Sequence, residues 1–121
     1  MCFNEKTWRF KRYPKHVTPA VYRDRPISDI DTITKNSDSL YYPQHDPKTI
    51  EETVLREGEY VRSPKSQTVY KVNEFDSVVG ASKGLPSKWV KVESTNGEFH
   101  GRPIAEDEYR RFKTRIIPCC K

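Results

Sequence analysis

Glycine and proline divide this chain into two unlike parts. All five glycines of the 121 residues lie between Gly58 and Gly101, whereas the first 45 residues hold no glycine and four of the nine prolines. Proline fixes φ and biases the preceding residue toward extended conformations, so the first part is predicted to be a stiff, extended arm. We expect an arm over residues 1–45, a β-rich core domain with short helices over 46–117, and a cysteine-containing tail over 118–121.

Two short helices are expected before the glycine-rich part. Within the arm, three isoleucines recur at helical spacing, enough for one or two turns: Ile27, Ile30 and Ile33. Asp46 followed by Pro47 combines an N-cap with proline at the first helical position, which predicts a helix over about 47–56. The β-branched residues of 49–55 favour a strand instead, and the sequence leaves that alternative open.

After Gly58 the sequence changes to short runs of Val, Tyr, Trp and Thr bounded by turn residues. The predicted strands cover 59–63, 68–73 and 88–95. In the last of these, Val90 and Val92 share one face, as expected of a half-buried strand. Asn96-Gly97 is a strong signal for a two-residue hairpin, so the strand that follows should pair back along this one.

A final helix is expected near the C-terminus. Acidic residues 106–108 begin it and Arg110, Arg111 and Lys113 end it, which suits the helix dipole and permits i,i+4 ion pairs. Its apolar stripe comprises Ala105, Tyr109, Phe112 and Ile116. This helix should lie against the strands.

The stretches LREGEYVRSPKSQTVYKV and WVKVESTNGEF resemble the strands of a small SH3-like β-barrel of the KOW or Tudor type. The resemblance covers residues 55–100 and implies a fold but no particular ligand, because the aromatic cage and the RNA-contacting glycines of that family find no counterpart here. The expected fold class is α+β and mostly β: an SH3-like barrel or β-rich core with a C-terminal helix and an extended N-terminal arm.

The sequence contains no catalytic pattern. His16, His45 and His100 are scattered, and no nucleophile or metalloprotease motif frames them. The segment GASKGLPSK (80–88) resembles a phosphate-binding loop but lacks its spacing. The cysteines, Cys2, Cys119 and Cys120, lack zinc-site spacing. We therefore predict a protein that is not an enzyme and has no catalytic, cofactor-binding or metal-binding residues.

Charge and aromatic residues point instead to binding. The net charge is +5, and both ends of the chain are basic while residues 46–99 are close to neutral. Residues 8–15 read WRFKRYPK, with three aromatic side chains interleaved with cations. The predicted partner-binding residues are Trp8, Arg9, Phe10, Lys11, Arg12, Tyr13, Tyr22, Arg110 and Arg111. Aromatic residues would fill partner pockets and arginines would pair with acidic rims.

Two functions from different classes follow from this pattern. The first is a structural or assembly protein that docks through its arms on other subunits, of its own or another kind, such as a cement, decoration or connector component of a viral (phage) capsid. The alternative is a small nucleic-acid-binding module in which the WRFKRY patch stacks on bases and contacts phosphates. A small inhibitor that masks the site of another enzyme is a third class.

The sequence predicts no membrane association. No run of 18 apolar residues, secretory leader or lipidation motif is present in the chain. We expect a soluble protein made in the cytoplasm and, under the first hypothesis, incorporated into a virion.

Overall fold

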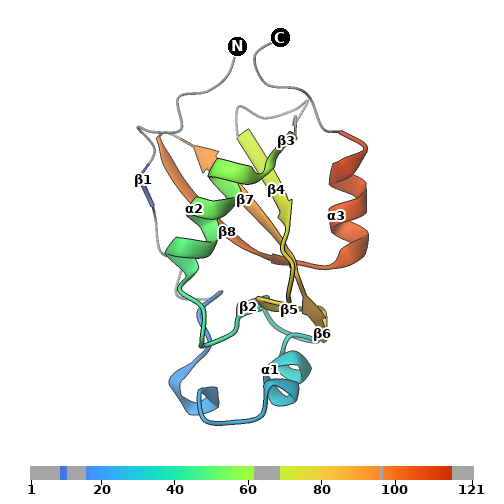
Figure 1. The fold of residues 1–121 in the computed structure, drawn as a ribbon. Coiled ribbons are helices and arrows are strands. Elements are labelled where there is room, and N and C mark those ends of the chain that lie inside the picture. Colours follow the sequence, from blue (N-terminus) through green and yellow to red (C-terminus); the bar gives the residue numbers. More distant parts are fainter. Residues whose placement is uncertain (1–8, 11–15, 62–68, 96, 116–121) are drawn as a thin grey trace.

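The computed structural model describes residues 9–10, 16–61, 69–95 and 97–115, and it is mixed α and β with more strand than helix. Eight strands form two sheets, accompanied by three α-helices and one 3-10 turn (Figure 1). The strands are β1 (Arg9–Phe10), β2 (Leu40–Tyr41), β3 (Glu59–Val61), β4 (Val69–Glu74), β5 (Gly80–Ser82), β6 (Leu85–Ser87), β7 (Trp89–Thr95) and β8 (Glu98–Ile104). The helices are η3 (Ala20–Tyr22), α1 (Ile27–Ile33), α2 (Pro47–Glu57) and α3 (Glu106–Lys113).

The larger sheet has the order β1-β8-β7-β4-β3. Its centre is the β7–β8 hairpin, in which Thr95 pairs with Glu98, as the Asn96-Gly97 signal predicts. Gly97 has a φ of 79°, a conformation that glycine adopts without steric cost. The strand β1 joins this sheet in parallel beside β8, and the other pairs are antiparallel.

Helices cover both faces of this sheet (Figure 1). On one face, Val90 and Val92 of β7 pack with the apolar side of α2, so the predicted alternation along β7 is confirmed. On the other face, Trp89 and its neighbours pack with Tyr109 of α3. The result is a helix–sheet–helix arrangement with two apolar layers.

The helix α2 begins at the predicted residue and ends one residue beyond the predicted range of about 47–56. The carboxylate of Asp46 accepts a hydrogen bond from the backbone N–H of Lys48, and Pro47 is the first residue of α2. The helical prediction for this segment is therefore confirmed over the strand alternative. At its other end, the Nζ of buried Lys71 donates to the carbonyl of Leu55, which supplies a partner and a positive charge to the helix C-terminus.

The smaller sheet has the order β2-β5-β6 and lies with α1 at the end of the molecule opposite β3 (Figure 1). It corrects the prediction of an extended arm over 1–45, because the larger described part of that segment, 16–45, folds against the strands. Ile30, Leu40 and Tyr42 are buried together with Ala81 of β5. The helical spacing of the isoleucines is confirmed by α1, but their packing shows that the segment contributes core residues, which a proline-based prediction could not reveal.

The β5–β6 hairpin was not predicted from the sequence. Its two turn residues, Lys83 and Gly84, have φ angles of 55° and 83°, as a type I′ turn requires. The segment that resembles a phosphate-binding loop is therefore a strand pair. Among the described strands neither sheet closes into a barrel, and the likeness to SH3-like barrels stays a prediction.

Candidate functional site

Five of the nine predicted partner-binding residues are among those that the structure describes. Trp8, Lys11, Arg12 and Tyr13 lie outside the described residues. Arg9 and Phe10 form β1, where the Arg9 side chain is exposed and the Phe10 ring packs 5.7 Å from the ring of Phe99. Phe10 is thus a partly buried residue at the edge of the core, which differs from an aromatic anchor presented to a partner.

Tyr22 also differs from the prediction. It packs partly buried against the cluster that contains Ile30 and Tyr42, and the guanidinium of Arg25 lies 5.7 Å from its ring centre. The side chain therefore helps to hold residues 20–33 against the small sheet. Its sequence context, a proline-rich segment, gave no sign of this packing.

Arg110 and Arg111 lie side by side in sequence on α3 but take part in different ion pairs. Arg110 donates from Nε and Nη2 to Glu106 Oε2, at 3.0 and 2.5 Å. Arg111 lies 3.4 Å from Asp107, which also lies 3.7 Å from Lys83 of the β5–β6 turn. Both i,i+4 pairs expected from the sequence are present.

Arg110 lines a groove of about 570 Å³ between α3 and the β4–β7 side of the large sheet. We call it the α3 groove, and its lining residues are Glu74, Lys88, Trp89, Glu106, Tyr109, Arg110 and Lys113. Trp89 and Tyr109 provide its aromatic surface, with ring centres 6.1 Å apart and planes inclined by 33°. The rings are tilted against each other, and because Tyr109 is only 8% exposed, Trp89 supplies most of the accessible aromatic area.

Charged side chains surround these rings in opposite-sign pairs. Lys88 lies 2.9 Å from Glu74 and 5.6 Å from the Trp89 ring centre, while Lys113 lies 3.1 Å from Glu59 and 5.7 Å from the Tyr109 ring centre. The hydrogen bond from Lys88 lowers the pKa of the Glu74 carboxyl. These pairs are exposed, so they contribute little to stability and remain available to a binding partner.

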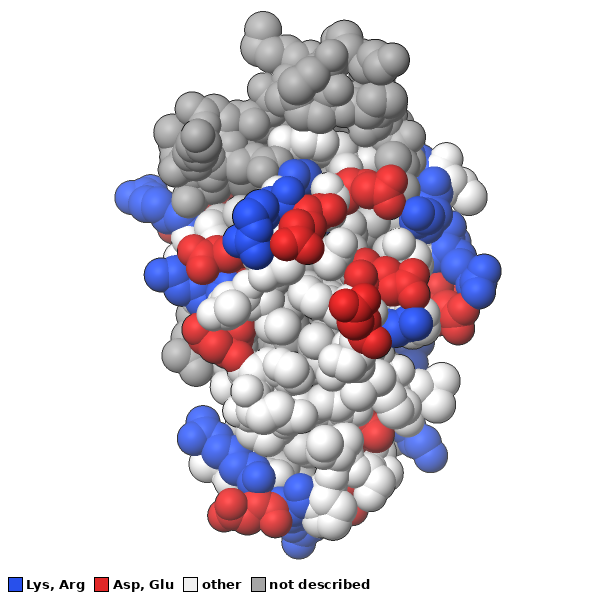
Figure 2. All heavy atoms as spheres, viewed as in Figure 1, with Lys and Arg blue, Asp and Glu red and all other residues white. Residues whose placement is uncertain are grey.

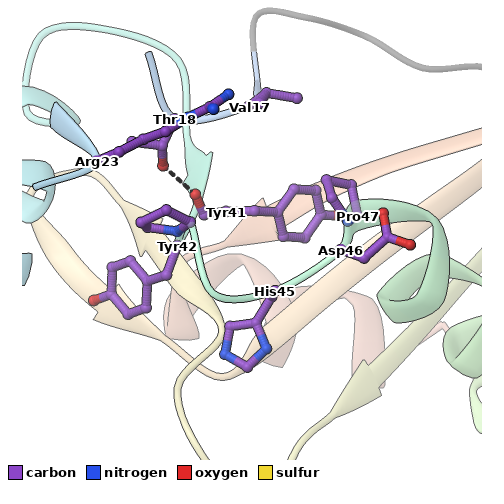
Figure 3. A pocket seen from close by; sticks show the side chains of 9 residues that line it. Val17, Thr18, Arg23, Tyr41, Tyr42, His45, Asp46 and Pro47 are labelled. Carbon is purple, nitrogen blue, oxygen red and sulfur yellow. Dashed lines mark hydrogen bonds between the residues drawn. The ribbon is translucent and has the colours of Figure 1, made fainter. Parts of the chain in front are cut away.

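A second, smaller cavity of about 240 Å³ lies between residues 17–23 and the β2–α2 connection (Figure 3). The Tyr41 side chain extends toward Pro47, and the Thr18 hydroxyl donates to the Tyr41 carbonyl. The carboxylate of Asp46 is already bound to the first turn of α2. The polar groups of this cavity therefore serve mainly to join the N-terminal segment to β2 and to cap α2.

Behind this cavity lies a buried acid that the sequence analysis missed. Glu51 of α2 is 2% exposed, and the Tyr41 hydroxyl donates to its Oε2 at 2.7 Å. Its Oε1 accepts no hydrogen bond of normal geometry from the described residues. Burial raises the pKa of Glu51 to about 8, although the bond from Tyr41 and the backbone N–H of Gly101 act in the opposite direction.

The Tyr41–Glu51 pair is a poor candidate for catalysis. Burial and the neighbouring carboxyl also raise the pKa of Tyr41. Perturbed groups of this kind often mark functional sites, but here the Glu51 carboxyl is enclosed by the core and does not line any of the cavities described above. A Glu next to another Glu on a helix gives no sequence signal that one of them is buried.

The described residues contain no group of three or more His, Cys, Asp or Glu side chains placed to hold a metal ion. None of the described helices is both long and apolar enough to span a bilayer. Comparison with protein-family models, with curated proteins and with solved structures finds no match.

Proposed function

We propose that this protein is a non-enzymatic interaction component that docks on a protein partner through the α3 groove. The observation that carries the proposal is that one groove is lined by the exposed Arg110, the half-buried Trp89 and the mostly buried ring of Tyr109. Tryptophan, tyrosine and arginine are the residue types that most often dominate the binding energy of protein interfaces. The paired charges around the rings suit a partner segment that carries both signs.

Charge balance supports a protein partner for this surface. The described residues contain 15 Lys or Arg and 16 Asp or Glu, so the described part of the chain is nearly neutral. On the face drawn in Figure 2, acidic and basic side chains are interspersed, and a broad uncharged band separates them from a smaller charged group at the bottom. A protein partner with mixed charge fits such a surface better than a polyanion does.

The larger context that we propose is a multi-subunit assembly. In a virion the protein would act as a cement, decoration or connector component. This part of the proposal derives from the sequence pattern of aromatic and basic residues in 8–13, four of which lie outside the described residues. The α3 groove adds a second surface, formed by described residues, through which a subunit could be held.

The docking proposal predicts a specific effect of charge reversal in the groove. Arg110→Glu should weaken binding of the partner at least tenfold, because it removes an interface arginine and places a like charge beside Glu106. The measurement is titration of the partner that co-purifies stoichiometrically from the native source. Arg56→Glu is the matched control, because Arg56 is an exposed arginine on α2, away from the groove.

Two results would contradict the docking proposal. One is a native preparation in which no protein accompanies the chain in stoichiometric amount. The other is equal partner affinity for the Arg110→Glu and Arg56→Glu variants, which would place the interface elsewhere.

Nucleic-acid binding is the second candidate, and the charge distribution along the chain favours it for a different region. Seven Lys or Arg but only one Asp or Glu lie in residues 1–8, 11–15, 62–68 and 116–121. Titration with single-stranded and duplex oligonucleotides at two salt concentrations tests it. Tight binding with a steep salt dependence that Trp8→Ala and Arg12→Ala both remove would favour this function over protein docking.

A further inference from the structure

A third cavity, of about 610 Å³, lies where three distant parts of the chain meet. The loop after α1 contributes Lys35 and Ser39, the β5–β6 hairpin contributes Ser82 and Lys83, and β8 contributes Arg102. In contrast to the α3 groove, it has no aromatic surface apart from the buried ring of His16. We call it the polar cavity.

Three of the lining side chains are cationic and one is acidic. Lys35 has no ion-pair partner among the described residues, whereas Lys83 lies 3.7 Å from Asp107. Arg102 donates bidentate hydrogen bonds from Nη1 and Nη2 to Oε1 and Oε2 of Glu108, at 3.3 and 2.7 Å, which fixes the guanidinium. The acidic lining residue is Asp38. The three cations therefore favour an anionic ligand. Because Asp107 and Glu108 already pair with Lys83 and Arg102, the ligand must carry more than one negative charge to compete with these carboxylates.

A buried hydroxyl supplies an independent observation. Ser39 is 6% exposed, and its Oγ has no hydrogen-bond partner among the described residues. Its backbone is held in place because the Ser39 carbonyl accepts a hydrogen bond from His16 Nδ1 at 2.8 Å. Buried hydroxyls are nearly always hydrogen-bonded; this one exposes less than 1 Å² and would donate to an anion in the cavity after rotating toward it.

Side chains, not backbone amides, would contact an anion in the polar cavity. The N–H of Gly84, which a phosphate-binding loop would offer to its ligand, donates instead to Thr34 Oγ1 at 2.8 Å. Ser82 and Lys83 nevertheless belong to the segment that resembles such a loop in sequence. Their contribution to the cavity arises from the hairpin turn, which places Lys83 beside the loop that follows α1.

We propose that the polar cavity binds a phosphate group. Lys35 and Arg102 would pair with its negative charge, and the Ser39 Oγ would donate a hydrogen bond to one of its oxygens. The phosphate comes either as the inorganic ion or as the terminal group of a small phosphorylated molecule, since both present the same dianion with three or more acceptor oxygens. This inference is independent of the docking proposal, because the polar cavity and the α3 groove share no lining residue.

The test is a titration of the ¹⁵N-labelled full chain, followed by amide chemical shifts, with inorganic phosphate, glycerol phosphate and acetate in separate series. Both phosphates should give saturable shifts at residues 34–39 and 82–84 with a Kd of about 1 mM or tighter, and acetate should not. Lys35→Ala and Ser39→Ala should each weaken phosphate binding about fivefold or more. Lys48→Ala, which removes an exposed lysine of α2, is the control and should leave the affinity unchanged.

The series also separates the two sources of phosphate. Tighter binding of glycerol phosphate assigns the cavity to a phosphorylated molecule, whereas equal or weaker binding assigns it to the inorganic ion. Shifts that stay linear up to tens of millimolar, or a Lys35→Ala variant that is folded and binds phosphate with unchanged affinity, would overturn the proposal. The dispersion of the same spectra shows whether each variant is folded.

Discussion

Ile30→Ala is expected to lower the free energy of unfolding by about 2–5 kcal/mol. Ile30 is fully buried between α1 and the small sheet, where it contacts the cluster formed by Leu40, Tyr42 and Ala81. Truncation to alanine removes buried apolar surface and leaves a cavity that the surrounding strands can fill only in part. Chemical denaturation followed by circular dichroism measures the effect directly.

The matched control lies one helical turn earlier. Ile27 belongs to the same helix but is 42% exposed, so Ile27→Ala should change stability by less than about 1 kcal/mol. The pair distinguishes a folded segment from an extended arm. Two variants with equally small effects would show that residues 27–33 do not pack in the core, and the arm prediction would then be correct.

Glu51→Gln is expected to raise stability at neutral and alkaline pH. The carboxyl has a pKa of about 8 in the folded protein and an ordinary value of 4.5, so the folded state holds this proton more tightly than the unfolded state. The stability that results is fully present below about pH 4.5 and is lost as pH rises through about 8. The upper limit of the loss is about 5 kcal/mol, from 1.4 kcal/mol per pH unit.

Glutamine keeps an acceptor for the Tyr41 hydroxyl but carries no charge. The free energy of unfolding of Glu51→Gln should therefore depend less on pH between about 4.5 and 8 than that of the wild type. Urea denaturation at pH 5, 7 and 9 would measure this, with wild type and variant converging at the acid end. Glu52→Gln is the control, because Glu52 is the adjacent, exposed residue of the same helix. If Glu51→Gln and wild type lost stability in parallel from pH 5 to 9, Glu51 would not be the group responsible.

Elements with local signals could be predicted from the sequence. The N-cap Asp46 with Pro47, the Asn96-Gly97 turn and the acidic-to-basic order of α3 each specify structure through neighbouring residues. The small sheet could not be predicted in this way. Its strand β2 has only two residues, and β6 contains Pro86, so pairing with a distant partner is what makes them strands.

The candidate site follows the same division. Arg110 was expected to bind a partner because of its charge, and it does line the α3 groove. The sequence places Trp89 only on a strand face and Tyr109 only on a helix stripe, since nothing in it shows that the two rings meet. The burial of Glu51 was equally invisible, because it depends on Tyr41 and Gly101 from other elements.

The pairing of Leu40 with Ala81 also bears on how the chain folds during synthesis. On the ribosome, β2 emerges long before β5, so its apolar side chains have no strand to pair with until Ala81 has left the exit tunnel. Closing the loop between β2 and β5 costs conformational entropy before any contact between the strands stabilises it, so such pairings form late. The α1–β2 segment should therefore acquire its contacts with β5 late, and β1, whose partner β8 follows β5 in the chain, should pair later still.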